Sequence, residues 1–134
     1  MFAFRDLIDL LTLVLECNVV EFNGSLYLQT WGTSMGAACS PIYADLFMSE
    51  LETTFLKTSG KKFKDNIYRG FMRRFLDDIV ILWKGPKERL EEFMCCLNNF
   101  HQTVKFTCCL DDFNKKTAVF LDTTIVIEEG VNAH

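Results

Sequence analysis

The stretch Arg74-Phe75-Leu76-Asp77-Asp78-Ile79-Val80-Ile81 places two adjacent carboxylates between two apolar runs, and it decides the fold. Strands rarely contain Asp and neighbouring like charges repel, so the pair predicts a tight turn between strands over residues 71–76 and 79–83. One interpretation is a simple solvated hairpin turn, because Asp side chains bond the local backbone in turns. The other is a divalent-metal site, since Mg²⁺ is typically held by one or two carboxylates together with water and substrate phosphates.

Positive charge is segregated along the chain. The net charge of -4 argues against general electrostatic binding to nucleic acid. However, half of the 14 basic residues lie within residues 57–74, namely Lys57, Lys61, Lys62, Lys64, Arg69, Arg73 and Arg74. These residues form either a patch that contacts a phosphate backbone or a solvated segment that keeps a hydrophobic domain soluble.

The cysteines and the apolar runs limit where in the cell the protein is expected. The 6 cysteines show no C-x-x-C spacing and no secretory signal precedes them, so we expect reduced thiols in an intracellular protein. Two vicinal pairs and a histidine offer a zinc alternative, but vicinal side chains diverge, which favours small core residues: Cys95, Cys96, His101, Cys108 and Cys109. The apolar run 7–15 is far shorter than the roughly 20 residues that a bilayer requires, so no membrane span is predicted.

Hydrophobic periodicity predicts the elements of the N-terminal half. Helical spacing of apolar residues within 1–18 predicts a first helix that is buried on more than one face. Asn23-Gly24 predicts a hairpin between strands at 19–22 and 26–30. A loop of small residues follows, and Ser40 as N-cap with Pro41 at the first helical position predicts a helix through about residue 57, closed by Gly60.

The C-terminal half continues the alternation of helices and strands. Gly85-Pro86 opens an amphipathic helix that should pack on a sheet. Residues 104–110 are expected as a strand, 111–116 as a turn, and 118–127 as one long or two short strands interrupted at Asp122. This order predicts an α+β fold, with helices gathered on one face of an antiparallel sheet.

Four segments in a fixed order resemble a known family. They read QTWGTSMG (29–36), SPIYADLFM (40–48), RFLDD (74–78), and VKFT (104–107) with FLD (120–122). Each is weak alone, but together they resemble the palm of reverse transcriptases, and most nearly the Penelope-like retroelement class, which is related to telomerase catalytic subunits. The resemblance spans about residues 10–127. It implies an incomplete polymerase palm whose parts are a helix at 1–18, a hairpin with glycine loop and helix at 19–57, the Asp-Asp hairpin at 68–84, and a helix with terminal strands at 86–127.

The resemblance implies RNA-directed DNA polymerase chemistry at the acidic turn. The family uses two metal ions, one activating the primer 3′-hydroxyl and one neutralising the triphosphate leaving group. Asp77 matches the main metal ligand and Asp78 the second, so two Mg²⁺ ions are expected in the intact enzyme. The implied partners are an RNA template, a DNA primer and a deoxynucleoside triphosphate, and the implied location is the nucleus.

Further positions take roles by the same resemblance. Nucleotide and template binding is assigned to Gln29, Gly32, Met35, Gly36, Ser40, Pro41 and Phe75. Two of these depart from many relatives, because Met35 stands where most have Gln, and Phe75 where many have Tyr. Lys105 is a candidate proton donor to pyrophosphate, although a surface lysine is the simpler interpretation. Primer positioning is assigned to Phe120, Leu121 and Asp122, and backbone contacts to Lys61, Lys62, Lys64, Arg69, Arg73 and Arg74.

One expected part of the family pattern is absent from the sequence. The polymerases carry an essential metal-binding Asp on a strand before the first helix, whereas this sequence starts at Met1 inside or just before that helix. Thumb and most finger segments are also missing. Two alternatives to a partial palm therefore stay open: a non-catalytic nucleic-acid-binding remnant that uses residues 57–74, and a small interaction domain whose first helix docks a partner.

We accordingly expect the purified chain to be inactive or nearly so, and to bind Mg²⁺ weakly, because a carboxylate of the metal site is missing. A primer-extension assay with template, primer and Mg²⁺ checks this expectation. Robust Mg²⁺-dependent extension would contradict it.

Overall fold

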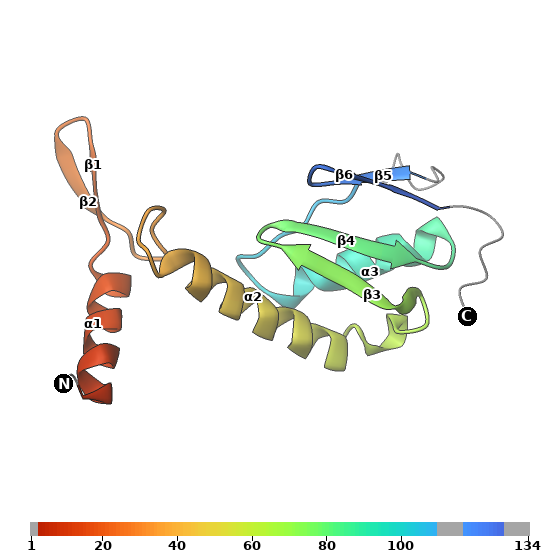
Figure 1. Ribbon diagram of the computed structural model, residues 1–134, viewed down its shortest axis with the longest axis horizontal. Coiled ribbons are helices and arrows are strands. Elements are labelled where there is room, and N and C mark those ends of the chain that lie inside the picture. The colour runs from red at the N-terminus through yellow and green to blue at the C-terminus, as the bar shows by residue number, and fades with distance from the viewer. Residues whose placement is uncertain (1–2, 110–116, 128–134) are drawn as a thin grey trace. The chain divides into compact units, whose positions relative to one another are not determined.

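The computed structural model describes residues 3–109 and 117–127. The order of elements is α1 (Phe4–Glu16), β1 (Val19–Phe22), β2 (Ser25–Leu28), α2 (Ser40–Lys57), the 3-10 turn η1 (Lys61–Phe63), β3 (Ile67–Phe75), β4 (Asp78–Trp83), α3 (Lys87–Phe100), β5 (Thr117–Phe120) and β6 (Thr123–Val126) (Figure 1). The described chain is thus a small α+β fold, as predicted, with three α-helices and short antiparallel strand pairs. It divides into two compact units, Met1–Glu50 and Leu51–His134, which are described separately.

The strands do not form the single sheet that was expected. Within the described residues they form three separate two-stranded sheets, β1–β2, β3–β4 and β5–β6. Residues 104–109 form no strand, contrary to prediction, and Leu110 and the predicted turn at 111–116 lie outside the described residues. The cause is Asn98 of α3, whose amide donates to the Phe106 carbonyl at 2.9 Å and accepts from the Phe106 N–H at 2.6 Å. A helix side chain therefore takes the backbone groups that a ladder would use.

The three hairpins turn in two different ways. Asn23 and Gly24 both have positive φ, 50° and 74°, which is the type I′ turn expected of this dipeptide. The other two turns are Leu76-Asp77 and Leu121-Asp122, and in each the leucine alone has positive φ, 52° and 55°. The interruption at Asp122 is confirmed as a turn between two short strands. A leucine in this backbone region is strained by about 1–3 kcal/mol.

The acidic turn lies one residue earlier than the sequence predicted. Leu76 was expected in the strand and Asp78 in the turn, but Asp78 is the first residue of β4 and pairs with Phe75. The sequence favoured Asp-Asp because leucine is a poor turn residue. Similarly, α2 starts at Ser40 itself, since the Tyr43 N–H donates to the Cys39 carbonyl at 2.9 Å, so Ser40 lies in the first turn instead of capping it.

The core of the second unit is aromatic. Phe55 of α2, Phe63 of η1 and Phe93 of α3 have no exposed area. The Phe93 ring meets the other two edge to face, with centroids 5.5 Å and 5.3 Å away, an arrangement that adds to the burial energy. Ile67 completes the core from β3, and Met72, Ile81 and Trp83 of the hairpin pack against it. The predicted packing of α3 on a sheet is therefore confirmed for the β3–β4 hairpin (Figure 1).

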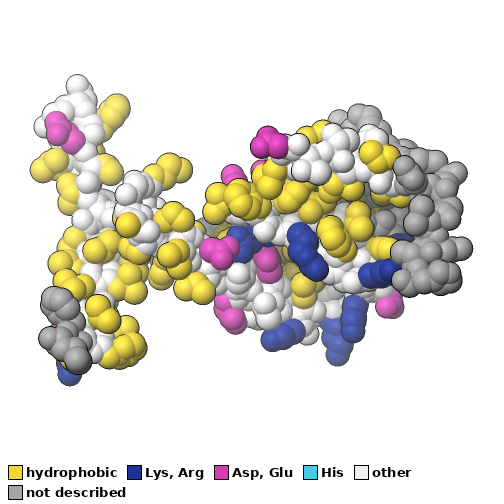
Figure 2. Space-filling view, viewed as in Figure 1, with side chains coloured by type: hydrophobic (Ala, Val, Ile, Leu, Met, Phe, Trp, Pro, Cys, Tyr) yellow, Lys and Arg dark blue, Asp and Glu magenta, His cyan; other side chains and the backbone are white. Residues whose placement is uncertain are grey.

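The first unit does not show the burial expected of its helix. None of the residues of α1 is buried, and Phe4 is 80% exposed. Figure 2 shows hydrophobic side chains spread over this unit. None of the helices in the described part of the chain combines the length and apolarity needed to cross a bilayer.

Replacing Phe93 by Ala should lower the free energy of unfolding of the second unit by about 3–5 kcal/mol, because a fully buried ring leaves a cavity among rigid neighbours. Denaturant unfolding followed by Trp83 fluorescence measures this loss, since the indole lies 5.4 Å from the Phe93 ring. Phe75→Ala, at a position 55% exposed, is the control and should cost less than about 1 kcal/mol. Equal losses of unfolding free energy in Phe93→Ala and Phe75→Ala would contradict the assignment of the core.

Candidate functional site: the acidic hairpin tip

The β3–β4 hairpin presents two carboxylates at its tip. Asp77 lies in the turn and Asp78 begins β4, and both residues are exposed. The other end of the hairpin is held by the core through Met72, Ile81 and Trp83. A fixed base with an open tip leaves the two carboxylates accessible to a large ligand while limiting the positions that they sample.

A buried guanidinium holds the turn in place. Arg74 Nε contacts Glu52 Oε1 of α2 at 2.5 Å, and their side chains are only 7% and 19% exposed. The Arg74 Nη1 donates to the carbonyl of Leu76 at 3.0 Å, which is the strained turn residue. Arg74 was assigned to a nucleic-acid backbone, but its guanidinium faces the protein, so it is a positioning residue for the tip.

Sequence reasoning missed Glu52 and the inward direction of Arg74. A usable signal was strand alternation, because Arg74 lies two residues from Met72 and shares its face of β3. Met72 packs on the core. A cation on the buried face of a strand requires an anion on the element beneath it, and α2 supplies one.

The described residues contain few metal ligands. No group of three or more His, Cys, Asp or Glu side chains within them could hold an ion. The zinc alternative, which needs four ligands, therefore finds no support there. Desolvation and the neighbouring Cys109 also raise the pKa of the Cys108 thiol, which disfavours the thiolate. Asp77 and Asp78 suit Mg²⁺ by donor type, with most coordination positions left to water or phosphate oxygens.

The glycine loop belongs to the first unit. Gly32 and Gly36 have φ of 79° and 101°, so the backbone conformation itself calls for glycine at both positions. The Gln29 amide donates to the Trp31 carbonyl at 2.8 Å and stabilises the loop from within, while Met35 is fully exposed. Ser40, at the start of α2, is buried. The loop and the acidic tip lie in different units, so the structure describes each by itself.

Lys105 contacts the end of a helix. Its ammonium donates to the carbonyl of Asn98 and, at 3.1 Å, to that of His101. These carbonyls close the C-terminal end of α3, where a cation offsets the helix dipole. The position supports the simpler interpretation of Lys105 as a surface lysine, here one that stabilises the helix.

The assigned primer-positioning residues form the β5–β6 turn. Phe120 is half-buried, whereas Leu121 and Asp122 are exposed. Leu121 and Asp122 occupy the same turn positions as Leu76 and Asp77. The chain thus builds the Phe-Leu-Asp turn twice, once with a second carboxylate and once with Thr123 after it.

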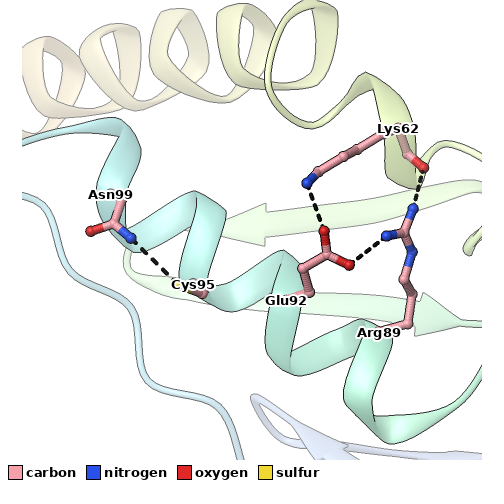
Figure 3. Close-up of polar contacts among 5 residues, drawn as sticks. All are labelled: Lys62, Arg89, Glu92, Cys95 and Asn99. Atoms are coloured by element: carbon pink, nitrogen blue, oxygen red, sulfur yellow. Dashed lines mark hydrogen bonds and ion pairs between the residues drawn. The ribbon is translucent and has the colours of Figure 1, made fainter.

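The predicted basic residues fall into two groups. Lys62 joins a surface network: Glu92 accepts from Lys62 Nζ at 2.6 Å and from Arg89 Nη1 at 2.5 Å, while Arg89 Nη2 donates to the Lys62 carbonyl at 2.9 Å (Figure 3). The bond to Lys62, followed by that to Arg89, lowers the pKa of Glu92, and Glu92 raises the pKa of Lys62. This network joins η1 to α3.

The second group is exposed, as Lys62 is, but takes no part in this network. It consists of Lys61, Lys64, Arg69 and Arg73. Figure 2 shows Lys and Arg side chains gathered over the second unit.

Figure 3 also shows a hydrogen bond within α3, in which Asn99 donates to Cys95 Sγ at 3.4 Å.

Comparisons of this chain with family models, with curated proteins and with solved structures find no match.

Substituting Glu52 by Ala should lower the free energy of unfolding by about 2–3 kcal/mol, because it leaves the buried Arg74 guanidinium without its anion. Chemical denaturation measures the change. Glu91→Ala, at an exposed position of α3, should stay within about 0.5 kcal/mol of the parent. The double variant Glu52→Leu with Arg74→Met should recover most of the loss. Glu52→Ala as mild as Glu91→Ala would show that the pair does not hold the hairpin.

Proposed function

We propose that this chain is part of a reverse-transcriptase palm, in which Asp77 and Asp78 hold the metal ions of nucleotidyl transfer. The observation that carries the proposal is the presentation of two adjacent, exposed carboxylates at the tip of a hairpin that is anchored in the core. The four ordered segments that resemble the family support it independently. The antiparallel hairpins and the packed helices are compatible with an incomplete palm.

The residues present fit magnesium as the resident metal. Mg²⁺ prefers carboxylate oxygens and retains positions for water and substrate phosphates, and an exposed pair of aspartates satisfies both needs. When bound, the metal supplies neutralisation of the triphosphate and activation of a hydroxyl nucleophile. The chain itself positions the carboxylate, since Arg74 fixes the turn that carries Asp77.

The same geometry explains why the tip is open. A primer end and a nucleotide are large ligands, and a site for them cannot lie inside the small core. Phe75 and Leu76 flank the carboxylates and are 55% and 54% exposed. They place apolar surface beside the charged pair, against which a base or sugar can rest.

Two carboxylates alone should bind a free divalent ion weakly, and a deoxynucleoside triphosphate should strengthen that binding. Phosphate oxygens fill positions that the protein leaves open, and the gain should be about tenfold, equivalent to one charge-assisted contact of about 1.4 kcal/mol. Paramagnetic broadening of amide signals by Mn²⁺ measures this, with the largest effect expected from Leu76 to Ile79. Asp77→Asn with Asp78→Asn should abolish it.

The chain contains a matched control for this experiment. Asp122 occupies the same position in the same type of turn as Asp77, but no second carboxylate follows it. Asp122→Asn should therefore leave Mn²⁺ broadening at the acidic tip unchanged. Equal broadening around Asp122, or binding at Asp77 that ignores the triphosphate, would favour a simple solvated turn over the proposed site.

A further inference from the structure

The β1–β2 hairpin of the first unit is apolar on both of its faces. Cross-strand partners share a face, so Val19 and Leu28 lie on one side of the hairpin, and Val20 and Tyr27 lie on the other. All large apolar residues of the hairpin are at least half exposed: Val19, Val20, Phe22, Leu26, Tyr27 and Leu28. A two-stranded hairpin is only marginally stable alone, and independent stability needs three or more strands or a packed helix. Within the described part of the chain, no third strand joins this hairpin.

The pairing identifies the backbone groups on the outer edge of β2. Opposite residues in an antiparallel pair alternate between hydrogen-bonded and non-hydrogen-bonded positions. The Gln29 N–H donates to the Asn18 carbonyl at 2.8 Å, so these two residues form a hydrogen-bonded pair. Alternation from this pair along the hairpin places Leu26 and Leu28 at non-hydrogen-bonded positions. Their N–H and C=O groups therefore point away from β1, toward an edge beside which the described residues place no other strand.

The outer edge of β2 lacks the side chains that normally prevent strands from pairing with another chain. Exposed edges are usually protected by charged residues, especially Lys, or by Pro. Strand β2 reads Ser25-Leu26-Tyr27-Leu28 and contains neither. The opposite edge of the hairpin belongs to β1, in which Glu21 occupies an outward-pointing position. Pairing with a further strand is therefore favoured at β2 and opposed at β1.

We propose that β2 pairs with β2 of a second copy of this chain, so that two hairpins form one four-stranded antiparallel sheet about a two-fold axis. With Tyr27 on the axis, Leu26 of each copy lies opposite Leu28 of the other, and the outward N–H and C=O groups of both leucines are all bonded. The two Tyr27 side chains then form a cross-strand aromatic pair, which stabilises the sheet further. The contact is self-complementary, because each copy offers the same strand in the opposite direction.

The dimensions of the hairpin support a second copy as the occupant. Neighbouring strands are about 4.8 Å apart and a helix is about 10–12 Å across, so one hairpin is too narrow to cover a helix, whereas four strands span about 14 Å. None of the residues of α1 is buried. The large apolar residues of α1 and the hairpin are 39% to 80% exposed. Their apolar surface is on the order of 1,000 Å², and a standard interface needs about 800 Å² from each partner.

The self-pairing goes beyond the proposed polymerase role and does not depend on it. The β1–β2 hairpin belongs to the first unit, whereas Asp77 and Asp78 belong to the second. Asp77→Asn with Asp78→Asn should therefore leave the oligomeric state unchanged. Variants that lose the dimer should in turn keep the Mn²⁺ broadening at the acidic tip. Failure of either proposal is thus distinguishable from failure of the other.

Sedimentation equilibrium of the full chain over a wide concentration range should show a reversible monomer–dimer equilibrium. Tyr27→Lys should weaken the dimer by about tenfold or more, because two ammonium groups then face each other at the axis, and high salt should restore part of the affinity. The matched control is Val20→Lys, at the cross-strand partner of Tyr27. Val20 and Tyr27 are 50% and 52% exposed. Because Val20 lies one strand away from the axis, its substitution should leave the dimer affinity unchanged.

Amide hydrogen exchange and proline substitution locate the pairing edge. Protection of the Leu26 and Leu28 amides should rise with chain concentration, because these donors are bonded only in the dimer. The outward amides of Val19 and Glu21 on β1 should exchange rapidly at every concentration. Leu28→Pro removes an outward donor without breaking a bond of the hairpin, and it should dissociate the dimer. Val19→Pro, at the cross-strand partner of Leu28, removes the equivalent donor of β1 and should leave the dimer intact.

Several results would overturn the proposal. A monomer at every concentration would do so, as would a dimer that Tyr27→Lys and Val20→Lys weaken equally. Strands β5 and β6 also lack charged residues, so loss of the dimer in Val126→Lys alone, at a position 57% exposed, would assign the contact to that hairpin instead. Growth beyond a dimer would show open-ended strand pairing rather than a two-fold contact. Far-ultraviolet circular dichroism of each variant confirms that the fold is retained.

Discussion

The edge-to-face packing of three phenylalanine rings is the contact on which the second unit depends. Phe55, Phe63 and Phe93 come from α2, η1 and α3, and they share one buried centre against which the β3–β4 hairpin packs. Since each element contributes one ring, none can bury its apolar face without the other two. The hairpin gains its fixed base from this centre, and the acidic tip is carried on that base.

The two ends of β3 serve different purposes because different side chains hold them. At the tip, Arg74 pairs with Glu52 and bonds the carbonyl of the strained Leu76, while Asp77 and Asp78 are exposed. At the other end, β3 is bulged between Ile67 and Met72, and Tyr68 and Arg69 are exposed there. Lys62 is paired with Glu92 on the surface. Of the cations clustered in sequence, Lys62 and Arg74 thus join elements of the second unit through ion pairs.

Local signals in the sequence predicted much of the fold but little of the site's support. Asn23-Gly24 encodes its own turn, and the apolar spacing of α3 encodes its buried face, so both were predicted correctly. The acidic turn was misplaced by one residue because Leu76 takes the turn position with positive φ, and leucine is a poor turn residue. The strand expected at 104–110 is missing from 104–109 because Asn98, in the preceding helix, bonds the backbone of Phe106. The partners of Arg74 and Lys105 are likewise set by contacts that no local pattern records.

The repeated Phe-Leu-Asp turn has a consequence for local opening. Val119 stands before Phe120 where Arg74 stands before Phe75, so the two turns share a backbone conformation but differ in the residue that precedes it. The strain at each leucine favours local opening of its turn, and a side-chain contact with the core opposes that opening. Amide hydrogens around Asp77 should accordingly exchange with solvent through openings tied to the release of Glu52, while those around Asp122 open with their own hairpin. The stiffness of the acidic tip is in this sense a property of helix α2.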